Sequence, residues 1–450
     1  IAKEIDARLP SHIKGSTFHS VGFGAWMRYK GVGFKAIKVN GYKTRNLLQA
    51  MFADGGTDNR GYPTYNREAV DAYASFVQRL VGLAKNSGIG FLVPDDTQSW
   101  WNLIDHHDIS LDVDDPDYTE DEAIEISRKI LRRGRDDDQH LEIDFDDMLY
   151  LPLVFKASFK RHDWVMIDEA QDTNAVQVAL IKRMLKEQGR LIAVGDRGQA
   201  IYGFRGADSS AMDNIKRAFD CTELPLSICY RCDVQIVEAA QDYISDTILP
   251  RDDAAEGFAG RWKEDDSWVE SLVPGDAILC RNVAPMIAQA YELLGKGVGC
   301  YVEGRDIGKG LIDVVEKMRE NDLEKMLVKL EEWKDREVEK WTSKGQETRA
   351  GGIEDKCDCI QIIADHLDEG SRSTGDLIAQ IQLMFDEDRH GAVVLSTVHK
   401  AKGREWDRVF ILNRDTLMPS PWARQEWQKV QENNLIYVAY TRAAHELYLV

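Results

Sequence analysis

Two acidic residues, Asp168 and Glu169, directly follow the apolar run at residues 164–167. A second apolar run, residues 191–194, ends two residues before another carboxylate, Asp196. Buried parallel strands end in this way when they deliver carboxylates to the edge of an open sheet, where ligands bind in α/β folds. We therefore expect these acids to lie together at one edge of a parallel sheet.

The residues between the two runs have the pattern of a helix. Val176, Leu180 and Met184 recur at helical spacing, and Gly189 is placed to end the helix before the second run begins. Strand, helix and strand in this order form a βαβ unit, whose strands are parallel. Both sets of acids then leave the sheet at its carboxyl edge.

Carboxylates at such an edge suit nucleotide hydrolysis. Asp168 would hold Mg²⁺, Glu169 would orient or deprotonate the attacking water, and Gln199 would touch a terminal phosphate or that water. A plain βαβ scaffold with solvated acids is the alternative. It explains less, because Gln199 is followed by an aromatic-Gly-aromatic-Arg segment at residues 202–205 that a scaffold does not need.

Two strings in this region carry a family resemblance. Asp-Glu-Ala-Gln-Asp begins at Asp168, and Val-Gly-Asp-Arg-Gly-Gln-Ala-Ile-Tyr-Gly-Phe-Arg-Gly-Ala begins at Val194. They resemble motifs II and III of superfamily 1 DNA helicases of the UvrD/Rep type. Three further stretches resemble later motifs of that family and occur in the family's order, at residues 224–232, 391–406 and 437–444.

The resemblance implies an α/β fold with two RecA-like parallel-sheet domains, of the P-loop NTPase class, with helical insertions. The accessory insertion of the second domain is expected to be much shorter than in larger relatives. The expected parts are a first RecA-like domain at 1–25 and 141–222, its helical insertion at 26–140, a second RecA-like domain at 223–307 and 376–450, and a short helical accessory insertion at 308–375.

By the same resemblance the cofactors are ATP and Mg²⁺, and ATP is hydrolysed between the two domains. Arginine suits phosphate because its planar fork grips two oxygens and stays charged. The implied catalytic residues are Asp168 (also the Mg²⁺ ligand), Glu169, Gln199, Arg231 and the arginine finger Arg442; Tyr230 would stack on adenine, and Gly403 and Glu405 would face the nucleotide, with Glu405 on the ribose.

The implied partner is single-stranded DNA, including junctions with duplex DNA, along which the motor steps 3′→5′. Stacking of bases on aromatic side chains is worth about 1–3 kcal/mol per base and tolerates any sequence, as a translocating motor requires. We therefore expect no base-specific readout. The implied DNA-binding residues are Phe18 and His19, in a short polar-aromatic loop; Tyr202, Phe204 and Arg205, under the strand; and Thr397 and His399, on the backbone.

The chain contains no Gly-x-x-x-x-Gly-Lys-Ser/Thr phosphate loop. In the family this loop precedes the segment around Phe18, so we expect the sequence to be a fragment that begins after it. One alternative is the motor part of a helicase–nuclease. Another is a nucleic-acid-binding protein that has lost nucleotide hydrolysis. Retention of phosphate-facing residues in both halves argues against the second alternative.

The net charge of −20 excludes a broadly basic nucleic-acid surface, so strand binding must rest on stacking and a few placed cations. The longest apolar runs are too short to cross a membrane. Seven cysteines without framework spacing favour a reducing cytoplasm. Cys229 with Cys232, and Cys357 with Cys359, could form a zinc site only if both pairs fold together, and their spacing matches no standard zinc motif.

Overall fold

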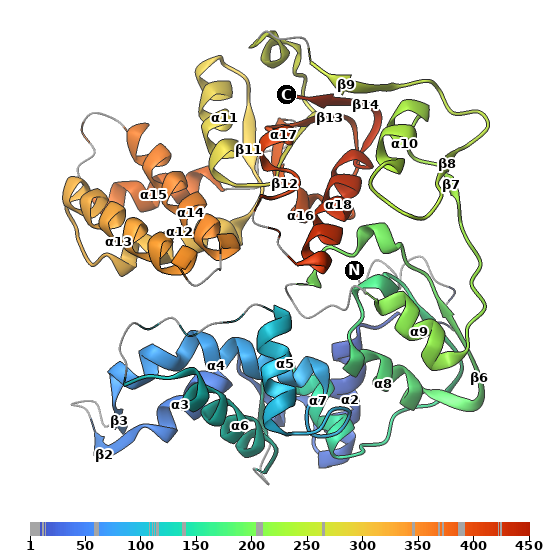
Figure 1. Cartoon of the computed structure of the whole chain (residues 1–450), viewed down its shortest axis with the longest axis vertical. Helices are drawn as coiled ribbons and strands as arrows, with labels where there is room; N and C mark the ends of the chain where they lie inside the picture. The colour runs from blue at the N-terminus through green and yellow to red at the C-terminus, as the bar shows by residue number, and fades with distance from the viewer. Residues whose placement is uncertain are drawn as a thin grey trace. The chain divides into compact units, whose positions relative to one another are not determined.

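The structure is a computed structural model of the 450-residue chain (Figure 1). It describes residues 10, 13, 15–57, 63–107, 109, 111, 113, 117–136, 141–203, 210–262, 266–343, 347–367, 370, 373–385, 392–421, 423 and 425–450.

The chain forms two compact units. The first unit consists of Ile1–Asp196 with Tyr202–Glu223, and the second of Arg197–Ile201 with Leu224–Val450. Both units combine α-helices with parallel strands, which confirms the predicted α/β class.

The predicted βαβ arrangement is present in the first unit. Strand β5 (His162–Ile167), helix α8 (Ala175–Met184) and strand β6 (Leu185–Ala193) follow one another, and the two strands are parallel. Helix α8 begins with a capping box, in which Asn174 and Gln177 exchange side-chain and backbone hydrogen bonds.

The expectation that Gly189 ends the helix is wrong. Helix α8 ends at Met184, and Gly189 lies inside β6. The pairing of β6 with β5 jumps by several residues just after His162, so Gly189 belongs to an irregular excursion of the strand. A Cβ atom on Gly189 would lie 3.0 Å from the carbonyl oxygen of His162, which explains the glycine by close backbone approach.

Strand β5 is buried on one face only, whereas its apolar sequence predicts burial on both. Val165 and Ile167 pack in a cluster with Ile181 of α8. Trp164 and Met166 point the other way and expose 50% and 63% of their surfaces. Helix α8 covers the first face, and no described element buries the second.

The other described elements of the first unit are mainly helical, and helices α4 and α6 carry much of its core. Strands β1 and β4 are parallel, and β2 and β3 antiparallel. The elements are α2 (Phe18–Lys30), β1 (Lys38–Val39), α3 (Lys43–Met51), β2 (Ala53–Thr57), β3 (Pro63–Tyr65), α4 (Arg67–Ser87), α5 (Thr97–His107), α6 (Glu120–Asp136), β4 (Glu142–Ile143), α7 (Asp147–Val154) and α9 (Ala211–Phe219).

A buried group of charges lies within the helical part of the first unit. Lys85 contacts Asp144 at 2.5 Å and Asp147 at 2.8 Å, and Lys43 contacts Asp147 at 2.6 Å. Burial lowers the pKa of Lys85, but the two carboxylates outweigh it and hold the pKa above its ordinary value. The neighbouring Asp146 has its pKa raised to about 6, first by burial and then by the charge of Asp144.

The second unit is built on a six-stranded sheet in which every pairing is parallel, in the order β11-β12-β10-β13-β14-β9. The central strand β10 is fully buried, as expected for a parallel sheet covered on both faces. The strands are β9 (Phe258–Arg261), β10 (Ala277–Cys280), β11 (Cys300–Val302), β12 (Val393–Thr397), β13 (Trp406–Ile411) and β14 (Ala443–Leu449), with a separate parallel pair, β7 (Ile228–Cys229) and β8 (Leu249–Pro250).

The helices α12–α15 gather beside α11 (Figure 1). They share one hydrophobic cluster with the sheet, in which Leu330 and Ile360 of the helices lie with Ile278 and Phe410 of the strands. The helices of the second unit are α10 (Val234–Gln241), α11 (Ala284–Gly295), α12 (Arg305–Lys317), α13 (Leu323–Ser343), α14 (Glu347–Asp365), α15 (Thr374–Met384), α16 (Val398–Ala401), α17 (Arg414–Leu417) and α18 (Glu426–Tyr440).

Replacing Lys85 with Met should destabilise the first unit by about 3–5 kcal/mol, because it leaves buried carboxylates with one cation fewer. Lys38→Met is the matched control: Lys38 pairs with Glu142 on the exposed surface and should cost less than about 1 kcal/mol. Urea unfolding of both variants measures the difference. An equal loss of unfolding free energy in the two variants would show that the buried charges contribute little to the stability of the first unit.

Asp146→Asn should make stability less dependent on pH. The raised pKa means that folded Asp146 holds its proton more tightly than unfolded Asp146, so wild-type stability falls as pH rises from about 4 to 6. The amide keeps an oxygen that can accept from Asn86 and has no charge facing Asp144, Asp147 and Lys85. At pH 7 the variant should gain about 3 kcal/mol, and at pH 4 less than about 1 kcal/mol. Unfolding curves at both pH values test this, and a gain that is the same at both would contradict it.

Candidate active site

Asp168 and Glu169 lie where the sequence predicts them, directly after β5, and both are exposed. Strand β6 pairs with β5 so that Ile167 lies opposite Ala193. The residues that follow the two strands therefore leave the sheet at the same carboxyl edge. An exposed carboxylate such as that of Asp168 fits Mg²⁺, which is commonly held by one or two carboxylates together with substrate phosphates.

Gln171 connects the ends of the two strands, and sequence reasoning did not single it out. Its side-chain nitrogen donates to Oε2 of Glu169 at 2.5 Å, and its side-chain oxygen accepts from the backbone nitrogen of Asp196 at 3.1 Å. Gln171 is buried. Gly195 leaves room for it, because a Cβ there would lie 2.5 Å from Oε1 of Gln171. The position of Gln171 within the Asp-Glu-Ala-Gln-Asp string was the available signal.

The backbone of Glu169 is in the left-handed region, with φ of +51°. A residue with a Cβ pays a conformational cost there, and such residues cluster at functional sites. Its backbone nitrogen donates to Oδ1 of Asp168 at 3.0 Å. The turn thus presents two adjacent exposed carboxylates at the sheet edge, and each accepts a hydrogen bond from a neighbouring residue.

In the second unit, Glu405 and Arg442 lie side by side. Glu405 precedes β13 and Arg442 precedes β14, and the first residues of these strands, Trp406 and Ala443, are paired. Arg231 forms a 2.5 Å ion pair with Glu405 and donates to the carbonyl oxygen of Thr441 at 3.4 Å. The amino edge of the sheet therefore gathers Arg231, Glu405 and Arg442 into one cluster, which we call the amino-edge cluster.

Arg442 exposes 1% of its surface, which rules out a solvated helix-surface cation. Its guanidinium donates to the carbonyl oxygens of Val438 and Arg404 and to the hydroxyl of Thr441, at 2.8–3.2 Å. Burial and the nearby charge of Arg231 lower the pKa of Arg442 to about 10, so it stays charged at neutral pH. Tyr230, next to Arg231, exposes 72% of its surface and presents a ring on which a base could stack.

Gln199 lies in the short segment of the chain that packs in the second unit. The side chain of Asn434 in α18 donates to the carbonyl oxygens of Arg197 and Ala200, at 3.1 and 3.0 Å. Lys402 donates to the carbonyl oxygen of Gln199 at 2.8 Å. Gly403, which follows Lys402, has φ of +84°, a conformation that favours glycine. The hydrogen bond of Lys402 therefore links the backbone at Gln199 to the segment that contains Gly403.

The predicted DNA-binding residues of the second unit lie at the other edge of its sheet. Thr397 ends β12, and its hydroxyl accepts from the backbone nitrogen of Lys400 at 3.4 Å, which caps α16. Thr397 is buried and His399, in α16, is half-buried. The side chain of Thr397 thus serves as a helix cap in this structure.

The predicted DNA-binding residues of the first unit are only partly described. The expectation of a loop at Phe18 and His19 is wrong, because Thr17 caps α2 and Phe18 is its first residue. Phe18 packs against apolar clusters, and His19 makes an edge contact with Phe145. Tyr202 is half-buried, and Phe204 and Arg205 lie outside the described residues.

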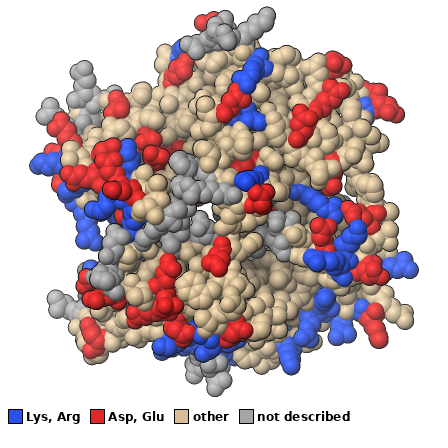
Figure 2. Space-filling model, viewed as in Figure 1, with Lys and Arg blue, Asp and Glu red and all other residues tan. Residues whose placement is uncertain are grey.

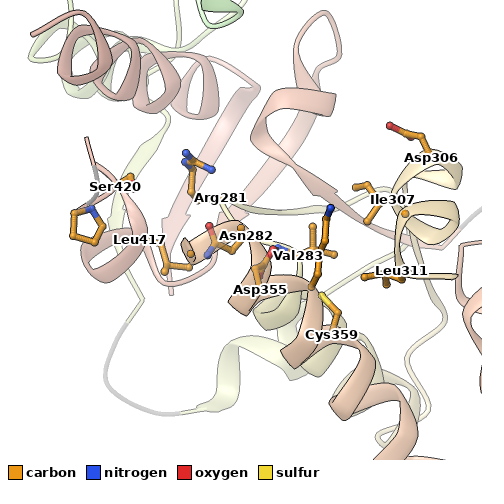
Figure 3. A pocket seen from close by; sticks show the side chains of 15 residues that line it. Arg281, Asn282, Val283, Asp306, Ile307, Leu311, Asp355, Cys359, Leu417 and Ser420 are labelled. Atoms are coloured by element: carbon orange, nitrogen blue, oxygen red, sulfur yellow. The ribbon is translucent and has the colours of Figure 1, made fainter. Parts of the chain in front are cut away.

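A pocket of about 440 Å³ lies elsewhere in the second unit (Figure 3). Arg281 and Asn282, just after β10, face Asp355 and Cys359 of α14 across it. Asp355 accepts hydrogen bonds from the backbone nitrogens of Val283 and Ala284, at the start of α11. None of the predicted site residues lines this pocket.

Positive charge on the first unit is local. On the face shown in Figure 2, Lys and Arg side chains gather over α8 and α9, whose cations include Lys182, Lys216 and Arg217. This local gathering fits a chain whose net charge of −20 leaves no broad basic surface. Within the described residues, no helix is long and apolar enough to span a membrane, and no group of three His, Cys, Asp or Glu side chains could hold a metal ion.

Both halves of the chain match known family models. The UvrD/REP helicase N-terminal domain matches residues 11–220, and the UvrD-like helicase C-terminal domain matches residues 305–450. The chain belongs to the UvrD/Rep helicase family. Its two parallel-sheet units accordingly have the RecA-like fold of the P-loop class, as the motifs predicted.

Several UvrD/Rep relatives align with part of the chain. A probable DNA helicase II homolog from Mycoplasma pneumoniae is 32% identical over 27% of the chain and 19% of its own length. The ATP-dependent DNA helicase Rep of Buchnera aphidicola is 30% identical over 24% of the chain and 17% of its own length. DNA helicase II of Haemophilus influenzae is 32% identical over 21% and 13%. The chain thus matches less than a fifth of each relative's length.

Replacing Arg442 with Met should destabilise the second unit by about 1–3 kcal/mol, because the carbonyl oxygens of Val438 and Arg404 lose their buried donor. Arg231→Met removes an exposed ion pair of the same cluster and should cost less than about 1 kcal/mol. Urea unfolding compares the two variants. A larger loss of unfolding free energy in Arg231→Met than in Arg442→Met would contradict the conclusion that the buried hydrogen bonds of Arg442 stabilise the second unit.

Proposed function

We propose that the protein is the ATP-driven motor of a DNA helicase, which translocates 3′→5′ along single-stranded DNA and acts at junctions with duplex DNA. The match of both halves to UvrD-type helicase domains carries this proposal. It is supported by the carboxylates at the carboxyl edge of β5 and by the arginines of the amino-edge cluster. ATP and Mg²⁺ are the proposed cofactors.

In the first unit, Asp168 is the proposed Mg²⁺ ligand and Glu169 the proposed general base. Bound Mg²⁺ would neutralise charge on the phosphates. Glu169 would take a proton from the attacking water. Gln171 would orient the carboxylate of Glu169 through its hydrogen bond to Oε2. Gln171 would connect the ends of β5 and β6, because its side-chain oxygen also accepts a hydrogen bond from the backbone nitrogen of Asp196. Gln199 would touch the terminal phosphate or the water.

In the second unit, nucleotide binding would change the hydrogen-bond partners of Arg231 and Glu405 in the amino-edge cluster. Arg231 pairs with Glu405 in this structure. A γ-phosphate could instead accept two parallel hydrogen bonds from its guanidinium, which is a stronger, bidentate interaction. Released from Arg231, Glu405 could accept from a ribose hydroxyl. Gly403 would lie close to the nucleotide, and Tyr230 would stack on its adenine. Arg442 would supply positive charge to the transferred phosphoryl group, and this requires some of its present hydrogen bonds to break.

The proposed DNA contacts are Phe18, His19, Tyr202, Phe204, Arg205, Thr397 and His399, with aromatic stacking supplying affinity for any base. A motor that belongs to a helicase–nuclease would share all of these residues.

The decisive test is ATP hydrolysis by the full-length protein, because these 450 residues contain no Gly-x-x-x-x-Gly-Lys-Ser/Thr phosphate loop. Single-stranded DNA should stimulate turnover. Glu169→Gln should lower kcat by about 100-fold or more with nucleotide affinity unchanged, because it removes the base and keeps the shape. A coupled phosphate-release assay gives kcat, and a fluorescent nucleotide gives the affinity.

Glu187→Gln serves as the control, since Glu187 is an exposed acid near the start of β6, at the opposite end of the strand from Asp196. It should leave turnover unchanged. Normal turnover in Glu169→Gln would remove the catalytic assignment. A protein that binds single-stranded DNA but does not hydrolyse ATP, even with a phosphate loop, would instead be a non-hydrolysing binding protein.

A further inference from the structure

Glu303 is a buried carboxylate that the proposed function does not use. It directly follows β11, and its backbone nitrogen donates to the carbonyl oxygen of Leu395 at 2.8 Å, which fixes its backbone to the sheet. Its Oε1 forms an ion pair with Nη1 of Arg404, and its Oε2 has no hydrogen-bond partner within the described part of the chain. Arg404 thus supplies the cation that this buried carboxylate needs.

Arg404 lies between Gly403 and Glu405, the two residues proposed to face the nucleotide. Its side chain reaches Glu303, and its own carbonyl oxygen accepts a hydrogen bond from Nη1 of Arg442 at 2.8 Å. All of these residues belong to the second unit. A single residue therefore connects the buried carboxylate of Glu303 to the guanidinium of the proposed arginine finger.

The main chain of Arg442 is held by the same segment. The backbone nitrogen of Trp406, two residues after Arg404, donates to the carbonyl oxygen of Arg442 at 2.9 Å. The segment from Arg404 to Trp406 therefore contacts both the guanidinium and the backbone of Arg442. It also carries Glu405, which pairs with Arg231. A displacement of this segment would move Glu405 and Arg442 together.

Two ion pairs join the residues after β11 to the connection between β12 and β13, and they differ in burial. Asp306 and Lys400 are both exposed. In the other pair Arg404 is half-exposed, but Glu303 is buried. An exposed pair contributes little, whereas a buried carboxylate that loses its cation is left uncompensated. The Glu303–Arg404 pair is therefore the stronger restraint on this connection.

We propose that Glu303 and Arg404 are positioning residues for ATP hydrolysis. Neither side chain is proposed to contact the nucleotide. Their ion pair fixes the segment that presents Glu405 to the ribose and keeps Arg442 beside it, where charge develops on the transferred phosphoryl group. A small displacement of a catalytic group lowers the rate strongly, so a residue that holds the segment in place affects turnover. This role rests on the proposed function of the nucleotide site.

Hydrogen exchange of the backbone, followed by mass spectrometry without nucleotide, tests the restraint. Glu303→Gln keeps the shape and removes the charge, so it holds Arg404 less firmly. The peptide with the amides of Arg404 and Trp406 should then exchange about tenfold faster, because the segment opens more often. Asp306→Asn is the matched control, because it breaks the exposed pair with Lys400, and it should leave this peptide unchanged.

A peptide from the central strand β10 separates local from global opening. Its exchange should stay the same in Glu303→Gln, because the pair restrains the segment and not the whole sheet. Equal acceleration in β10 would show a general loss of stability and overturn the proposal. The proposal would also fall if Glu303→Gln left the peptide unchanged, or if Asp306→Asn accelerated it as much.

Turnover by the full-length protein tests the consequence for catalysis. Glu303→Gln should lower kcat by about tenfold and change the affinity for a fluorescent nucleotide by less than about threefold, because Arg442 acts mainly on the transition state. Asp306→Asn should leave kcat unchanged. A loss of affinity with normal kcat in Glu303→Gln would contradict the positioning role.

Variants of Arg404 give a second test, which remains available if Glu303→Gln does not fold. Arg404→Lys keeps a cation for Glu303 and should hold kcat within about threefold of the wild type, whereas Arg404→Gln should lower it by about tenfold. Equal kcat values in these two variants would overturn the proposal.

The two kinds of measurement separate this proposal from the proposed function. If the wild type does not hydrolyse ATP, the motor and the role in hydrolysis are both removed, and the exchange result alone decides whether the pair restrains the segment. If the wild type is active and Glu303→Gln turns over normally, the motor stands and the positioning role is removed.

Discussion

The parallel pairing of β13 with β14 determines which residues of the second unit can act together. Because Trp406 lies opposite Ala443, the residues just before them, Glu405 and Arg442, leave the sheet side by side. Arg231 joins them from a separate segment through Glu405 and the Thr441 carbonyl. The same direction of the strands sends Thr397, at the end of β12, to the opposite edge. Within the second unit, the shared direction of the strands therefore places Glu405 and Arg442 at one edge of the sheet and Thr397 at the other.

Much of this organisation could be predicted from the sequence, because it depends on features that neighbouring residues share. Apolar runs that end in acids predicted β5, β6 and their common edge, and motifs in family order predicted two parallel-sheet units. The end of α8 could not be predicted in this way. Gly189 is a reasonable helix terminator in sequence, but its position is decided by the close approach of the His162 carbonyl oxygen.

The remaining details depend on contacts between distant residues, which local patterns do not contain. The sequence predicts an arginine finger at Arg442, but it does not show that the carbonyl oxygens of Arg404 and Val438 surround the guanidinium. Gln171 looks like one polar residue in a turn, yet it joins Glu169 to Asp196. The run of apolar residues in β5 also does not reveal that the face with Trp164 is exposed, because burial of a strand face depends on which element covers that face.

Asp355 of α14 ties helices α12–α15 to the sheet of the second unit. Its carboxylate accepts from both backbone nitrogens that open α11, and this helix follows β10 directly. Helices α12–α15 also share one apolar cluster with the strands. A hinge needs a boundary with few contacts, and this boundary is packed and hydrogen-bonded. Helices α12–α15 are therefore joined to the sheet by a packed and hydrogen-bonded boundary, which lacks the sparse contacts of a hinge.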